Sequence, residues 1–93
     1  GRPLFDKSTR VLAQLSAMLK GQIPLIGVGG ISNALDAYTK ICAGATAVQL
    51  YTAFTFEGFS LLGEIASGLD EQLAKEGFEN VRDAVGSKTD KWL

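Results

Sequence analysis

The sequence contains no histidine and a single cysteine, Cys42. Without histidine, the chain cannot supply a Ser–His or Cys–His catalytic pair or a histidine metal ligand. A lone cysteine cannot form an internal disulfide, which fits a reducing compartment. Cys42 follows an isoleucine in a helix-forming stretch, where a free cysteine usually packs as a small hydrophobic side chain. We therefore expect neither a metal site nor a reactive thiol in this chain.

Long hydrophobic runs and an excess of one charge are also missing. No apolar stretch reaches the roughly 18 residues that a membrane-spanning helix needs, and no signal-peptide pattern opens the sequence. Nine Lys and Arg residues against ten Asp and Glu residues give a net charge of −1. Because there is neither a basic stripe nor a polybasic patch, the composition argues against nucleic acid as a partner and against an electrostatic membrane patch.

What the chain does contain is a large share of apolar residues. Hydrophobic residues make up 46% and charged residues 20% of the 93 positions, which suits one small domain or part of a larger one. The opening residues, GRPL, have the composition of a loop, and no initiating methionine precedes them. We therefore expect this to be the C-terminal part of a longer protein.

The segment 24–32, PLIGVGGIS, organises the expected fold. A short apolar run ends in Gly27, Gly29 and Gly30 and leads through a serine into a helix-forming stretch. A strand that turns sharply into a helix leaves backbone N–H groups pointing at one place, which is the geometry of a phosphate site. The same glycines could serve only to turn the chain tightly. The segment 45–53, ATAVQLYTA, repeats the pattern of strand and turn, and two neighbouring turns can share one anionic ligand.

Hydrophobic spacing and capping residues predict alternating helices and strands. Either Ser32 or Asn33 is expected to cap the second helix, with Asp36 completing a capping box with Asn33. The expected elements are a loop at 1–7, a helix at 8–20, a strand at 22–28, a helix at 34–43, a strand at 46–50, a turn at 51–56, a helix at 59–76, a short helix at 80–85 and a fraying tail at 87–93. This order predicts parallel strands with right-handed crossovers, and the apolar first strand is expected to be covered on both faces.

Several motifs, in this order and spacing, resemble the C-terminal end of the dihydroorotate dehydrogenase family. They are GRPL at 1–4, IPLIGVGGIS at 23–32, Asp36-Ala37, AGA at 43–45 and VQLYTAFTFEG at 48–58. The LYTA form of the last motif is similar to the class 2, membrane-associated, quinone-using branch. The resemblance implies an α/β fold, the C-terminal part of a TIM (β/α)₈ barrel that carries FMN. Residues 1–93 would supply its last two βα units, two parallel strands with flanking helices, and the C-terminal helices.

The resemblance also implies which residues bind the cofactor. Phosphate sites in such barrels usually lie in the loops after the seventh and eighth strands, where the two turns of this chain would fall. The residues expected to hold the FMN phosphate, mostly through backbone N–H groups, are Gly1, Gly29, Gly30, Tyr51 and Thr52. Outside the family context, Tyr51 would be an ordinary aromatic residue at a strand end, and Gly1 would carry no function.

The family's catalytic serine, its pyrimidine-binding asparagines, its flavin-facing lysine and its membrane-docking helices would all lie upstream, so no residue here is expected to be catalytic. Tyr51, Phe54 and Thr55 would border the route of the quinone, although Phe54, with Phe56 and Phe59, is expected to pack in the core first and to line that route second. The whole enzyme would oxidise dihydroorotate to orotate in pyrimidine biosynthesis and pass electrons through FMN to a quinone. It would sit on the cytoplasmic side of a bacterial inner membrane or on the mitochondrial inner membrane.

Two alternatives remain open from the sequence. The chain could come from another TIM-barrel enzyme that binds a phosphate, because many of these share the glycine turn. It could also be a catalytically inert piece that folds only by self-association, because two strands alone leave open edges.

Overall fold

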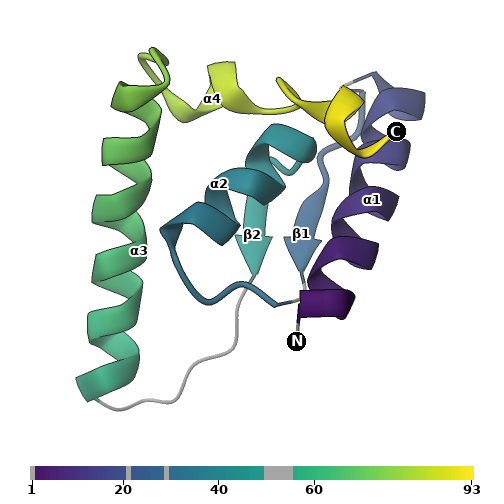
Figure 1. The fold of residues 1–93 in the computed structure, drawn as a ribbon. Coiled ribbons are helices and arrows are strands. Elements are labelled where there is room, and N and C mark those ends of the chain that lie inside the picture. Colours follow the sequence, from purple (N-terminus) through teal and green to yellow (C-terminus); the bar gives the residue numbers. More distant parts are fainter. Residues whose placement is uncertain (1, 21, 29, 50–55) are drawn as a thin grey trace.

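The computed structural model describes residues 2–20, 22–28, 30–49 and 56–93, with the side chains of Arg2 and residues 56–59 left out of the description. The elements are α1 (Arg2–Leu19), β1 (Ile26–Val28), α2 (Ala34–Ala43), β2 (Ala47–Gln49), α3 (Phe56–Lys75), α4 (Val81–Ala84) and a 3₁₀ helix, η1 (Thr89–Trp92). The strands β1 and β2 pair in parallel, and α2 connects them (Figure 1). The predicted alternation of helices with parallel strands is confirmed.

The register of the two strands gives the sheet one covered face and one open face. Gly27 lies opposite Val48; Gly27 is buried, and Val48 packs against both hydrophobic clusters of the core. On the opposite face, Ile26 is 61% exposed and Val28 40% exposed. The prediction that both faces of β1 are covered is therefore wrong for the described residues, because α2 and α1 cover only one of them.

Helix α2 lies at the centre of the core. Helical spacing predicts Ala34, Ala37, Tyr38 and Ile41 as its inner face; Ala37, Tyr38 and Ile41 are buried, and Ala34 is half-buried. Of the two possible caps, Asn33 is the one used, and its side chain accepts a hydrogen bond from the Asp36 backbone N–H at 2.8 Å. Two buried clusters lie on either side of α2. One contains Tyr38, Ile41, Cys42, Leu73 and Ala84. The other contains Leu12, Ala13, Ala43 and Ala45.

Helix α1 begins earlier than predicted. The segment 1–7 was expected to be a loop, but the helix starts at Arg2. Pro3 is compatible with this start, because a proline in the first turn removes an N–H that has no partner in the helix. Ser8, predicted from the sequence to cap this helix, instead lies inside it, where its hydroxyl donates to the carbonyl of Phe5 at 3.1 Å.

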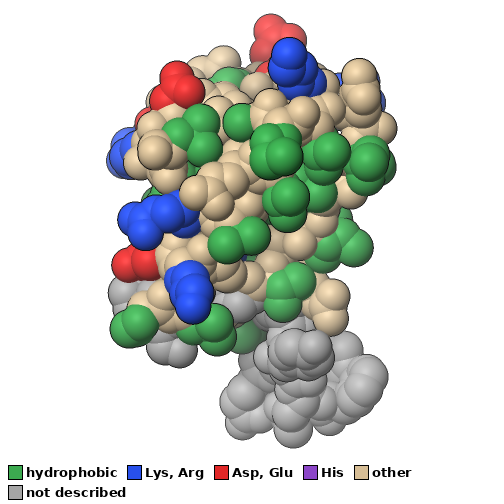
Figure 2. Space-filling view, turned by 90° about the vertical axis from the view of Figure 1, so that its right-hand side faces the viewer, with side chains coloured by type: hydrophobic (Ala, Val, Ile, Leu, Met, Phe, Trp, Pro, Cys, Tyr) green, Lys and Arg blue, Asp and Glu red, His purple; other side chains and the backbone are tan. Residues whose placement is uncertain are grey.

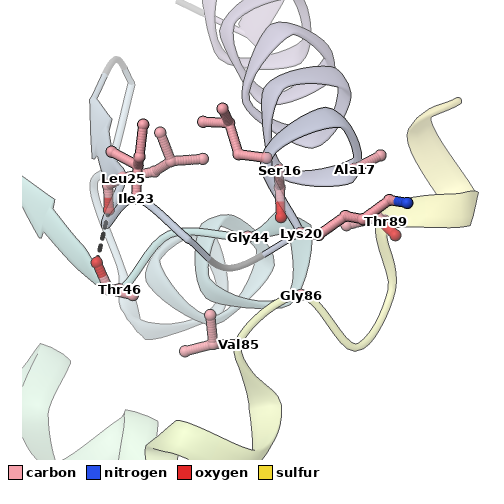
Figure 3. Close-up of a pocket in the computed structure, with 11 residues that line it drawn as sticks. Ser16, Ala17, Lys20, Ile23, Leu25, Gly44, Thr46, Val85, Gly86 and Thr89 are labelled. Carbon is pink, nitrogen blue, oxygen red and sulfur yellow. Dashed lines mark hydrogen bonds between the residues drawn. The ribbon is translucent and has the colours of Figure 1, made fainter.

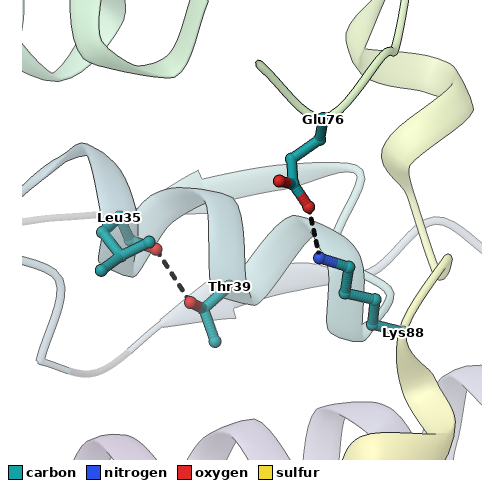
Figure 4. Close-up of polar contacts among 4 residues, drawn as sticks. All are labelled: Leu35, Thr39, Glu76 and Lys88. Atoms are coloured by element: carbon teal, nitrogen blue, oxygen red, sulfur yellow. Dashed lines mark hydrogen bonds and ion pairs between the residues drawn. The ribbon is translucent and has the colours of Figure 1, made fainter. Parts of the chain in front are cut away.

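The C-terminal tail is ordered, contrary to the prediction that it frays. Its backbone is tied to α2 by the N–H of Lys88, which donates to the carbonyl of Cys42 at 2.9 Å. The Lys88 side chain forms an ion pair with Glu76 at 2.9 Å, just beyond the end of α3 (Figure 4). Trp92 packs against the cluster that contains Leu12. Tertiary contacts thus order a segment that is almost entirely polar.

An apolar groove of about 420 Å³ runs between α1 and β1. Its hydrophobic lining includes Leu4, Val11, Leu15, Ile26 and Val28, each of which is at least 40% exposed. Figure 2 shows hydrophobic side chains gathered on this side of the molecule. Exposed apolar surfaces of this extent commonly mark a contact with another segment or another chain.

Candidate functional site

The candidate site lies at the edge where both strands end. Val28 at the end of β1 lies opposite Gln49 at the end of β2, so the two following segments leave the sheet at the same level. In Figure 1 the strands point toward the end of the molecule that holds the N-terminus, and α1, α2 and α3 all begin toward that end. Helix N-termini carry partial positive charge, so this edge is suited to an anion.

Gly30 has the conformation that the proposed turn requires. Its φ of 75° is in the left-handed region, which glycine adopts at little cost and other residues disfavour. It is exposed and lies two residues beyond the end of β1. The other predicted binding residues, Gly1, Gly29, Tyr51 and Thr52, lie outside the described residues.

Gly27 has a different role from the glycine of the turn. It is in the middle of β1 and buried. A Cβ added there would lie 3.1 Å from the Cβ atoms of both Lys40 and Ala45. Gly27 therefore permits close packing of the sheet beneath α2 and takes no part in the turn.

The segment between Gly30 and α2 is fixed by a buried carboxylate. Asp36 is only 3% exposed. Its Oδ2 accepts hydrogen bonds from the backbone N–H of Ser32 at 3.1 Å and from the Ser32 hydroxyl at 3.0 Å. A capping box would instead direct this carboxylate to the N–H of the cap residue Asn33. The observed bonds fix the residue before the cap, on the side of Gly30.

Lys40 joins α2 to the beginning of α1. Its side chain is completely buried, and its Nζ donates to the Ser8 hydroxyl at 2.6 Å and to the carbonyl of Phe5 at 3.4 Å. The ammonium also lies 4.5 Å from the centroid of the Phe5 ring. Burial lowers the pKa of Lys40, while the carboxylates of Asp36 and Asp6 act in the opposite direction. These contacts hold the first turns of α1 at the same edge as the glycine turn.

Neither the role of Lys40 nor the bond between Asp36 and Ser32 was predicted from the sequence. The signal for Lys40 was present in the spacing. The residue follows Ala37 by three positions and Asp36 by four, which places all three on one face of a helix. No comparable signal exists for the Ser32 bond, because a carboxylate at position 36 can reach several donors at the start of the helix.

A cavity of about 290 Å³ lies elsewhere, at the amino ends of the strands. It is lined by the end of α1, the segment before β1, Gly44, Thr46, Val85, Gly86 and Thr89 (Figure 3). The Thr46 hydroxyl donates to the carbonyl of Leu25 at 3.0 Å on its wall. Because this cavity is at the opposite edge from Gly30, it does not coincide with the predicted phosphate site.

The described ranges contain no group of three or more His, Cys, Asp or Glu residues that could hold a metal ion. Among the helices of those same ranges, none is both long enough and apolar enough to cross a bilayer.

Comparison with known proteins identifies the family. The sequence model of the family described as "Dihydroorotate dehydrogenase" matches residues 1–73. The chain belongs to the dihydroorotate dehydrogenase family. It is 55% identical over 93 residues to the dihydroorotate dehydrogenase (quinone) of Cereibacter sphaeroides, matching all of this chain and 26% of that protein. It is 52% identical over 87 residues to the mitochondrial dihydroorotate dehydrogenase (quinone) of Oryza sativa, matching 94% of this chain and 19% of that one.

Solved dihydroorotate dehydrogenase structures agree with the fold. A ligand-free DHODH from Eimeria tenella matches with a TM-score of 0.82 and 39% sequence identity, over 94% of this chain and 24% of that chain. The DHODH of the same organism in complex with ferulenol also has a TM-score of 0.82. The predicted fold class, an α/β portion of a TIM barrel, is confirmed. The chain spans about a quarter of the length of the bacterial relatives it matches.

Proposed function

We propose that residues 1–93 are the C-terminal fragment of a quinone-type dihydroorotate dehydrogenase and that they hold the phosphate of its FMN. The single observation that supports the phosphate site is the shared level at which β1 and β2 end, with Gly30 in the left-handed conformation at the exit of β1. Backbone N–H groups at such a turn, next to a helix N-terminus, are suited to a phosphate. The residues expected to complete the site are Gly1, Gly29, Tyr51 and Thr52.

The residues that the structure describes fit an anionic group at this edge. Gly30 has no Cβ to block a close approach to its backbone. The starts of three helices face the same end of the molecule (Figure 1), and α2 carries its cap and first turn directly after the glycine turn. Membership of the family favours FMN over the phosphorylated ligands of other TIM barrels.

The chain's own part in the reaction is to bind and orient. FMN, when bound, supplies the redox chemistry, the oxidation of dihydroorotate to orotate and the reduction of a quinone. No catalytic residue is assigned within residues 1–93. Parts of the enzyme outside this chain would make most of the contacts with dihydroorotate, quinone and the membrane. Within this chain, Tyr51, Phe54 and Thr55 would border the quinone route. The relatives named quinone enzymes, some of them mitochondrial, support a membrane-associated location.

The apolar groove between α1 and β1 supports the assignment to a larger barrel. It lies beside the edge of β1 that is not paired with β2. A barrel would place its preceding strand and helix at this edge. Self-association of the isolated chain across this surface stays a prediction.

Substitution of Gly30 tests the site. In the full-length protein, Gly30→Val is expected to weaken FMN binding at least about tenfold, because a β-branched residue resists a positive φ and its side chain blocks the approach of the phosphate. Flavin fluorescence during an FMN titration measures the affinity. Gly77→Val is the matched control, since Gly77 has a φ of 84° and a Cβ there would meet nothing within 4 Å. Equal affinity in the Gly30→Val variant and the control would rule out the glycine turn as the phosphate site.

A further inference from the structure

The turn that leaves β1 is attached to α2 through Ser32. Both the backbone N–H and the hydroxyl of Ser32 donate to the same oxygen of Asp36, at 3.1 Å and 3.0 Å. Ser32 follows Gly30 by two residues, so these two bonds fix the chain immediately after the glycine of the turn. The next residue, Asn33, fixes the start of α2, because its side chain accepts a hydrogen bond from the Asp36 N–H at 2.8 Å.

Asp36 can act as a fixed point because it is buried in a helix that packs against two others. It is 3% exposed and belongs to the first turn of α2, where the helix dipole favours a carboxylate. Helix α2 packs against both α1 and α3, and Ala37, Tyr38 and Ile41 of its inner face are buried. Through its bonds to Ser32, a carboxylate held in this way fixes the turn relative to α2.

The bond to Asp36 also limits which N–H groups can meet a ligand. The N–H of Ser32 is already donated to the carboxylate. A phosphate at this turn must therefore use N–H groups closer to Gly30. The position of those groups depends on where the chain is held at Ser32.

We propose that Asp36 is a positioning residue for the phosphate turn and that, acting through Ser32, it sets the preference of the protein for a phosphorylated flavin. This inference rests on the proposed function, because it assumes that the turn meets the FMN phosphate. The carboxylate itself does not touch the phosphate. It fixes the backbone donors that do.

The test compares two flavins that differ only in the phosphate. FMN and riboflavin share the ring system and the ribityl chain, so the ratio of their affinities isolates the contribution of the phosphate. In the full-length protein, Asp36→Ala is expected to lower this ratio by about tenfold or more, since two hydrogen bonds to a charged acceptor are lost. Asp36→Asn retains an acceptor at the same place and is expected to keep the ratio within about threefold of the original.

A purely structural role for Asp36 gives a different result. If the residue only stabilises α2, Asp36→Ala will weaken FMN and riboflavin equally, and the inference is overturned. Should that variant fail to fold, Ser32→Ala takes its place: it removes the hydroxyl bond alone, and an unchanged ratio would overturn the inference. A failure of the proposed function is recognised separately, because Gly30→Val would then bind FMN as tightly as the Gly77→Val control does.

Discussion

Two glycines of α3 allow the packing of α3 on α2 to be measured with one pair of substitutions. Gly68 faces α2, and a Cβ built on it would lie 2.5 Å from the Cβ of Ala34. Gly63 lies in the same helix, is exposed, and has nothing within 4 Å of the corresponding position. Replacing each glycine with alanine therefore makes the same chemical change in a crowded place and in an open one.

The expected magnitudes follow from these distances. Alanine is favoured over glycine in a helix interior by about 1 kcal/mol, so Gly63→Ala should stabilise the protein by about that amount. The same gain applies at Gly68, but two carbon atoms prefer a separation of about 3.5–4.0 Å, so the helices must move apart. Overpacking of this kind costs about 1–3 kcal/mol, which leaves Gly68→Ala unchanged in stability or destabilised by up to about 2 kcal/mol.

Thermal unfolding followed by circular dichroism distinguishes the two variants. For a domain of this size, each kcal/mol shifts the melting temperature by about 4–8 °C. The stabilities of the two variants should differ by about 2 kcal/mol, the middle of the expected range. Gly63→Ala should therefore melt roughly 8–16 °C above Gly68→Ala. If the two variants melted at the same temperature, α3 would not approach Ala34 this closely, and the account of the α2–α3 contact would be refuted.

Two buried titratable groups give predictions about pH. Burial lowers the folded-state pKa of Lys40 below its ordinary 10.5, so the free energy of unfolding should rise as the pH increases from that lowered pKa to 10.5. Urea titrations at several pH values should show no such rise in Lys40→Met. A rise that persists in this variant would contradict the burial of the ammonium. Burial raises the pKa of Tyr38 from 10.0 to about 12. The free energy of unfolding should therefore fall between pH 10 and pH 12 by about 2–3 kcal/mol in all. Tyr38→Phe should remove that loss. The Tyr38 hydroxyl is buried without a hydrogen-bond partner among the described residues, so the same variant should be no less stable at neutral pH, and a variant that is less stable there would contradict this.

The parts of the fold that the sequence predicted are those set by local patterns. Asn33, one of the two expected caps, begins α2, and Gly44 ends it, as a glycine after the last apolar residue of a helix predicts. Both signals are local, because side-chain capping and a glycine at positive φ act over a few residues. The parallel pairing followed from the alternation of strands and helices. The left-handed conformation of Gly30 agrees with the expected turn for the same local reason.

The parts that the sequence did not predict depend on distant contacts. The tail is polar except for its final residues, and its order comes from Trp92 and Lys88 reaching α1 and α2. The buried face of α1 contains Phe5, Thr9, Leu12 and Ala13, whereas the more regular apolar stripe through Val11 and Leu15 faces the groove. Periodicity identifies an apolar face, but it does not tell which neighbour covers that face.

The bond of Asp36 to Ser32 could not be derived from capping rules alone. Those rules direct the third residue of a helix back to its cap, and they assign Asp36 to Asn33. In the structure the backbone N–H of Asp36 does bind Asn33, but the carboxylate turns to the residue before it. The choice depends on the path of the chain out of β1, which is a property of the whole βα unit.

If the two turns hold the phosphate as proposed, the pairing of Val28 with Gln49 couples the packing of the sheet to ligand affinity. A slip of β2 by one residue would displace its exit by about 3.3 Å and turn Val48 away from the core. The spacing between the two turns and the burial of Val48 therefore cannot vary independently. Substitutions that shrink or enlarge the side chain at position 48 should then alter how tightly a phosphate is held.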